Sequence, residues 1–153
     1  MQRACDIRFA PVADVSVSMR VDGLPDSVTE LSGTEGKLQA RSRVRWGRED
    51  LDEDGHLGMT VDVDASICAG SLYVASDSES TGTARFGTNF IGGYVQTTIR
   101  QRILGADGMC LSAMADDTRE EVAGPIAFVP VADDATCTSL LARSWPVDAM
   151  PND

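Results

Sequence analysis

A strict alternation of apolar and polar residues between Lys37 and Trp46 limits the fold of this chain more than any other sequence feature. The parity of Trp46 carries only Leu, Ala, Ser and Val, whereas the other parity carries lysine, glutamine and three arginines. Successive side chains of a β-strand point to opposite faces, so the pattern predicts a strand with one buried and one solvated face. Residues 57–68 repeat the pattern, with Met59 and Val61 on the buried parity.

An acidic loop separates these two segments, and we expect them to form an antiparallel hairpin. One register places Val44 opposite Val61 and Trp46 opposite Met59 on the buried face. The same register faces arginines with aspartates on the other side, in the pairs Arg43–Asp62 and Arg41–Asp64. Cross-strand ion pairs contribute about 0.2–1 kcal/mol each, so they select the register more than they stabilise the sheet.

Alternation and turn-like separators predict further strands along the chain. These strands are expected at 15–21, 71–76, 83–90, 94–104, 109–115 and 125–132, with turns at 77–82, 91–93, 106–108 and 116–117. Capping-box patterns at 27–30 and 118–121 predict single helical turns. Asp134 or Thr136 could cap one more helix through residues 139–142.

Seven or eight short strands with little helix predict an all-β protein. We expect a single antiparallel β-sandwich, with a β-barrel as the alternative, and one or two short helical turns. A chain of 153 residues suits one domain. We expect that domain to span 1–145 and residues 146–153 to form a loose tail.

Four widely spaced cysteines suit two disulfides in an exported protein. No C-x-x-C pair occurs and there is one histidine, which argues against structural zinc. The expected bridges are Cys5–Cys68 and Cys110–Cys137, and four buried thiols in a cytoplasmic protein are the alternative. The N-terminus has no signal-peptide apolar region, so export requires that a leader was removed. The expected location is extracellular or periplasmic, with cytoplasm or a virion as alternatives.

The net charge of −11, with only one lysine, limits the kinds of molecule that the chain is expected to bind. Such a surface repels phosphate backbones and anionic lipid, so nucleic acid is not an expected partner. No run of 18 apolar residues occurs, so no membrane insertion is expected.

The acidic loop resembles the first half of an EF-hand calcium loop. Three aspartates match ligand positions one, three and five: Asp50, Asp52 and Asp54. Gly55 matches the turn glycine and the carbonyl of His56 the backbone ligand. The resemblance covers eight residues, because Val61 stands where the family has a bidentate Glu and no flanking helix is evident.

Related loops in non-helical extracellular domains use a distant side chain to complete the metal shell, and Asp62, Asp64 or Glu49 could serve here. The resemblance therefore implies a calcium site whose predicted ligands are Asp50, Asp52, Asp54, His56 and Asp62. The alternative is a solvated acidic turn, because Asp-Gly is a favoured hairpin dipeptide.

No residue pattern assigns a catalytic group. His56 is the sole histidine, and neither a G-x-S-x-G elbow nor a phosphate-binding glycine loop is present. Four aromatic residues could line a sugar-binding face: Trp46, Tyr73, Tyr94 and Trp145. Trp46, however, lies on the buried parity and is expected in the core.

The sequence thus predicts an exported, non-catalytic β-sandwich module with a structural or binding role, stabilised by calcium if the acidic loop holds the ion. Its ligand is a protein or a carbohydrate, and a homo-oligomer is left open. One alternative is a self-assembling surface or virion component. A small secreted enzyme inhibitor or enzyme is another.

Overall fold

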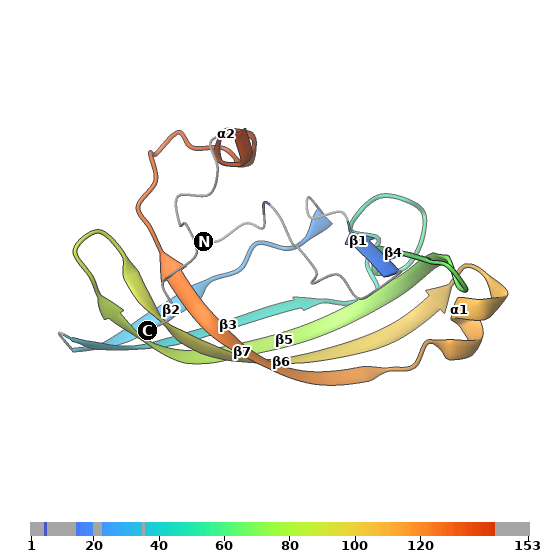
Figure 1. Ribbon diagram of the computed structural model, residues 1–153, viewed down its shortest axis with the longest axis horizontal. Coiled ribbons are helices and arrows are strands. Elements are labelled where there is room, and N and C mark those ends of the chain that lie inside the picture. The colour runs from blue at the N-terminus through green and yellow to red at the C-terminus, as the bar shows by residue number, and fades with distance from the viewer. Residues whose placement is uncertain (1–4, 6–14, 20–22, 35, 143–153) are drawn as a thin grey trace.

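The computed structural model describes residues 5, 15–19, 23–34 and 36–142 (Figure 1). Within them lie β1 (Val15–Met19), β2 (Thr29–Thr34), β3 (Lys37–Trp46), β4 (Met59–Ala65), β5 (Gly70–Phe86), β6 (Ile91–Ala106), α1 (Met109–Met114), β7 (Thr118–Phe128) and α2 (Cys137–Ala142). The all-β class with few short helices is therefore confirmed. Residues 146–153, the expected tail, lie outside the described part.

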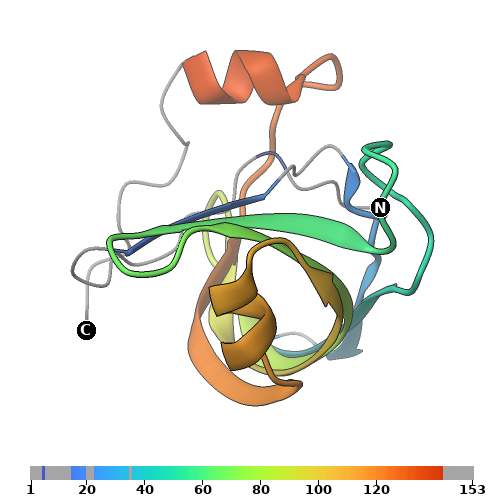
Figure 2. The same cartoon turned by 90° about the vertical axis from the view of Figure 1, so that its right-hand side faces the viewer.

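The seven strands belong to one antiparallel sheet, and β5 is its centre. One edge of β5 is shared, because Gly70 to Val74 pair with β4 and Ser76 to Ala84 pair with β3. Its other edge pairs with β6 along nearly its whole length. In the described chain β1, β2 and β7 each pair with one strand, so the sheet is branched and does not close into a barrel. Figures 1 and 2 show the long strands curving, with α1 at one end and α2 away from the sheet.

The predicted alternation of β3 is confirmed. Its even-numbered residues are buried or half-buried and its odd-numbered residues are exposed. We call the side of the sheet that carries Leu38, Ala40 and Trp46 the apolar face, and the side that carries Gln39, Arg41 and Arg43 the polar face. The buried hydrophobic residues of the described chain are Leu38, Ala40, Met59, Tyr73, Val74, Ala84 and Leu111.

The predicted hairpin between residues 37–46 and 57–68 is wrong. Val44 lies opposite Ser78 rather than Val61, and Trp46 lies opposite Ser76 rather than Met59. The physical reason is that alternation determines which face a side chain occupies but not which strand lies beside it. The connection between β3 and β4 is long enough to bring β4 to another stretch of the same β5 edge.

The predicted arginine–aspartate pairs are also wrong, because β3 lies beside β5 and not beside β4. Arg43 pairs with Asp77 on β5, and Asp62 instead accepts a hydrogen bond from Ser71 Oγ at 2.6 Å. Arg41 lies opposite Glu30 and Thr81, and Asp64 lies opposite Ser16. In the described chain, the ion pairs Arg43–Asp77 and Arg43–Glu79 join β3 to β5 rather than to β4.

The turns predicted at 77–82 and 91–93 are wrong, because both segments lie within long strands. Residues 77–82 have turn-like composition, yet β3 and β6 hydrogen-bond to both of their edges. Strand pairing on two sides satisfies every backbone group there, which outweighs a weak local preference for turns. Asp77 and Glu79 lie on the polar face, while serines and Gly82 face the apolar side.

Local patterns also failed at three shorter segments. The strand expected at 109–115 is α1, and the helical turns expected near 27–31 and 118–121 are β2 and β7. A four-residue capping pattern favours a helical turn only weakly, and hydrogen bonding of the segment to a free edge of the sheet outweighs it. The helix expected at 139–142 is confirmed as α2. Thr136 Oγ1 accepts a hydrogen bond from Ser139 N at 3.2 Å there, and Ser139 Oγ accepts one from Thr136 N at 3.0 Å.

Two disulfides form, but their pairing differs from the expected one. They join Cys5 to Cys137 and Cys68 to Cys110, with Cα separations of 5.1 and 5.7 Å. The expected pairing failed because cysteine spacing does not determine connectivity. Cys68–Cys110 fastens α1 to the connection between β4 and β5. Two bridges indicate an oxidising environment of the extracellular type.

Candidate metal centre

The acidic loop between β3 and β4 is closed at its base by backbone hydrogen bonds. Gly58 N donates to Glu49 O at 3.1 Å, and Leu51 N donates to Gly58 O at 3.4 Å. Gly58 has φ +86°, and a Cβ added there would lie 2.5 Å from Val74 O. Only glycine fits this close approach to β5.

The loop backbone folds around its own carboxylates. Asp50 Oδ1 and Oδ2 accept hydrogen bonds from Asp54 N at 3.1 Å and Gly55 N at 2.9 Å. Asp54 Oδ1 accepts one from His56 N at 2.9 Å. These short-range bonds are the ones that aspartate offers a turn, and they fix the directions of the carboxylates.

A second group of bonds ties the loop to β4. Asp52 Oδ2 accepts a hydrogen bond from Thr60 N at 2.9 Å, and the Thr60 hydroxyl donates to Asp54 Oδ2. Thr60 was not among the predicted site residues. The available signal was a hydroxyl residue at the start of β4, six residues after Asp54.

The carboxylates of Asp50, Asp52 and Asp54 converge. One oxygen of each lies within 4.8 Å of the others, with Asp50 exposed and the other two half-buried. Calcium binds oxygen ligands at about 2.3–2.6 Å, so two ligands of one ion lie at most about 5.2 Å apart. The triad therefore fits a single hard cation, and such a cation would remove the repulsion among the three negative charges.

The other two predicted ligands have different neighbours. The ring of His56 stacks on Tyr73 with centroids 4.0 Å apart and an interplanar angle of 8°. The Tyr73 hydroxyl lies 3.3 Å from His56 Nε2. The side chain of His56 is thus directed to Tyr73, whereas the predicted ligand of this residue is its backbone carbonyl. Asp62 lies on β4 and is bonded to Ser71. The carboxylate cluster is formed by the three aspartates of the loop.

The pKa of Tyr73, which lies beside the loop, is affected by its surroundings. Burial raises the pKa of its hydroxyl, and so does its hydrogen bond to Asp107. The negative charges of Asp107, Asp54 and Asp62 raise that pKa further. The phenol is neutral at physiological pH, as a phenol with the ordinary pKa of 10.0 also is, and can donate a hydrogen bond. Asp54 of the acidic loop is one of the three carboxylates whose negative charge acts on Tyr73.

The aromatic residues considered for a sugar-binding face are placed differently from one another. Trp46 is half-buried and its Nε1 donates to Val74 O at 2.9 Å, and Tyr73 is buried. Tyr94 is 54% exposed on β6. Trp145 lies outside the described residues.

Comparison of the chain with protein-family models, curated proteins and solved structures found no match. Within the described residues no helix has both the length and the apolar character needed to cross a membrane.

Proposed function

We propose that this chain is an exported, non-catalytic β-sheet module with a structural or binding role, stabilised by a calcium ion on Asp50, Asp52 and Asp54. The observation that carries the proposal is the convergence of three carboxylates in a loop already folded around them. Two disulfides support export. Calcium sites of extracellular modules work at about 10⁻⁴–10⁻³ M, a range that an incomplete ligand set suits.

The position of the loop gives the ion a structural role. The loop carries the chain from β3 to β4, and both strands pair with the same edge of β5. An ion held there would fix the branch point of the sheet. A ligand that binds only the folded state at 100 times its Kd adds about 2.7 kcal/mol to the free energy of unfolding.

The test is thermal unfolding with millimolar calcium and with excess chelator. We expect calcium to raise Tm, and Asp52→Asn combined with Asp54→Asn to abolish that rise. Asp133→Asn, which changes an exposed carboxylate after β7 that is not a candidate ligand, is the control and should keep the full calcium response. Because Asp52 also accepts a bond from Thr60 N, the quantity compared is the calcium-dependent rise and not Tm itself. Equal Tm with calcium and chelator would reject the metal site.

A second candidate is a self-assembling structural component, and surface exposure favours it. In the described chain seven hydrophobic residues are buried, whereas twelve large hydrophobic residues are exposed. Ile67 and Met109, next to the Cys68–Cys110 bridge, are each 92% exposed, and Phe86 at the other end of β5 is 61% exposed. Exposed apolar groups at both ends of a subunit are typical of contacts between copies.

Light scattering after size-exclusion chromatography tests assembly. The candidate predicts a mass well above 16.3 kDa that rises with concentration. Ile67→Ser combined with Met109→Ser should lower that mass, while Ser16→Ala, at an exposed position of β1, should not. A monomer at every concentration would reject assembly.

A further inference from the structure

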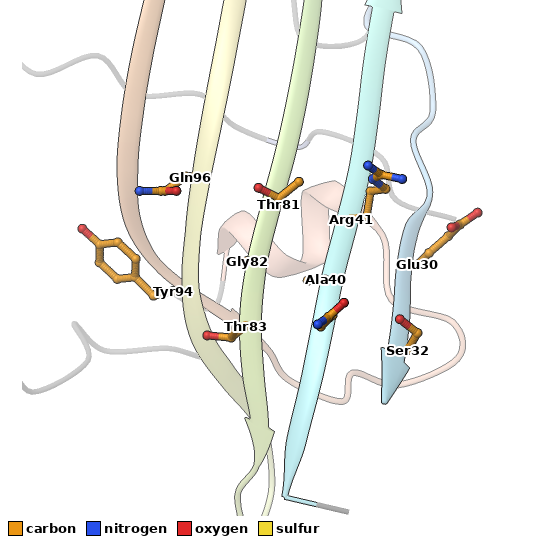
Figure 3. Close-up of a pocket in the computed structure, with 10 residues that line it drawn as sticks. Glu30, Ser32, Ala40, Arg41, Thr81, Gly82, Thr83, Tyr94 and Gln96 are labelled. Carbon is orange, nitrogen blue, oxygen red and sulfur yellow. The ribbon is translucent and has the colours of Figure 1, made fainter. Parts of the chain in front are cut away.

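Two neighbouring rows of polar side chains cross the polar face of the sheet from β2 to β6. The pairing register aligns the first row as Glu30, Arg41, Thr81 and Gln96. It aligns the second row as Ser32, Gln39, Thr83 and Tyr94. Figure 3 shows Glu30 and Ser32 at one margin, Tyr94 and Gln96 at the other, and the two threonines between them.

These rows border a groove of about 640 Å³. Its floor is the strand backbone at Ala40, whose methyl group belongs to the apolar face, and at Gly82, which has no side chain. Strands lie about 4.8 Å apart and alternate residues about 6.8 Å apart, so the groove is about 14 Å long and two rows wide. Its volume lies within the range of ligand sites, about 300–1,000 Å³, and its open shape admits an extended ligand.

The groove offers many hydrogen-bonding groups and no net charge. Its two inner strands carry Gln39, Thr81 and Thr83, which both donate and accept, and Arg41, which only donates. Gln39, Thr83 and Gln96 have no side-chain hydrogen bond inside the described structure, so their donors and acceptors are directed to solvent. Glu30 and Arg41 lie opposite each other and offset each other's charge. A net charge of −11 on the whole chain further disfavours anions.

Tyr94 adds an apolar surface at one end. It is 54% exposed and lies opposite Pro125 of β7. Its ring has an apolar body and a polar tip, which suits a ligand that has both C–H surfaces and hydroxyls. An aromatic platform beside neutral amides and hydroxyls is the arrangement that complements a sugar ring.

We propose that this groove binds a neutral oligosaccharide, with Tyr94 stacking on one ring and Gln39, Thr83 and Gln96 hydrogen-bonding to hydroxyls. The inference rests on the binding role within the proposed function but not on its calcium ion. A fully solvated polar face is the competing account, and it predicts no saturable binding.

The test is calorimetric titration of the full chain with three neutral hexasaccharides: β-1,4-linked glucose, β-1,4-linked N-acetylglucosamine and α-1,4-linked glucose. At least one should bind saturably. Tyr94→Ala should raise the Kd for that sugar about ten-fold, the size of one aromatic stacking contact. Tyr94→Phe should retain most of the affinity because the ring remains. Arg102→Ala, an exposed side chain further along β6, is the matched control and should leave Kd unchanged.

Absence of saturable binding to all three probes would overturn the proposal. So would binding that Tyr94→Ala leaves unchanged. Titration in excess chelator separates this proposal from the calcium site. If the sugar still binds and calcium does not change Tm, the proposal of a sugar-binding groove is retained and the metal site is rejected.

Discussion

Arg43 on β3 and Asp77 on β5 form a two-pronged ion pair across neighbouring strands. Arg43 Nε lies 2.9 Å from Asp77 Oδ1, and Arg43 Nη2 lies 2.5 Å from Asp77 Oδ2. The pair is diagonal, because Arg43 stands directly opposite Glu79 in the register. The planar guanidinium spans that offset, which a single-point lysine contact would not do. The pair belongs to the polar face and marks β5, not β4, as the neighbour of β3.

Because of this ion pair, the free energy of unfolding is expected to depend on pH in the acidic range. The hydrogen bond from Arg43 lowers the pKa of Asp77 below its ordinary value of 3.8, and the charges of Arg43, Arg45 and Arg100 lower it further. A carboxyl with a depressed folded-state pKa stabilises the fold above the unfolded pKa and loses that contribution as pH falls through the folded value.

We therefore expect Asp77→Asn to lower the free energy of unfolding at neutral pH. The deficit should shrink as pH falls below 3.8 and vanish once Asp77 of the parent protein is protonated. Urea unfolding of both proteins across this pH range checks the sign. A difference that stays constant with pH would mean that the charge of Asp77 does not matter.

Gly58 and Gly55 provide a matched pair of glycine tests in the acidic loop. Both have positive φ, +86° and +91°, but a Cβ at Gly58 would lie 2.5 Å from Val74 O whereas one at Gly55 meets nothing within 4 Å. Gly55→Ala should cost about 1–2 kcal/mol of backbone strain. Gly58→Ala should cost about 1–3 kcal/mol more, because the alanine collides with β5. Equal losses in chemical denaturation would contradict the close approach.

Met59 is the large side chain with no exposed surface in the described core. We expect Met59→Ala to lower the free energy of unfolding by about 2–5 kcal/mol, because it removes buried methylene groups and leaves a cavity. Met114→Ala is the control. Met114 is 73% exposed, so its truncation should change stability by about 0.5 kcal/mol or less. Similar effects of the two substitutions would place Met59 outside the core.

The disulfide pairing can be read directly by peptide mapping without reductant. The expected crosslinked peptides join Cys5 to Cys137 and Cys68 to Cys110. In the chain-entropy view, bridges with sequence separations of 42 and 132 contribute about 4 and 5 kcal/mol. Cys68→Ser with Cys110→Ser, and Cys5→Ser with Cys137→Ser, should each lower Tm in non-reducing buffer. A Cys5–Cys68 peptide would contradict the fold.

The candidate site could be anticipated only in part. Spacing alone indicated that Asp50, Asp52 and Asp54 could converge, because alternate carboxylates before a glycine are close in any sharp turn. Spacing could not reveal that the His56 ring stacks on Tyr73, since those residues meet only when β5 lies beside the loop. The groove was equally hidden: its rows draw residues from four strands, aligned by three separate registers.

The sequence by itself determined the all-β class, the strand at Lys37–Trp46 and the face that each of its side chains occupies. These properties depend on a two-residue period that neighbouring residues carry. Only the tertiary structure decided that β3 pairs with β5, that residues 77–82 continue a strand, and that Cys68 joins Cys110. The reason is physical: many registers bury the same apolar parity equally well. The choice among them is made by hydrogen bonds, ion pairs and packing between segments far apart in the chain.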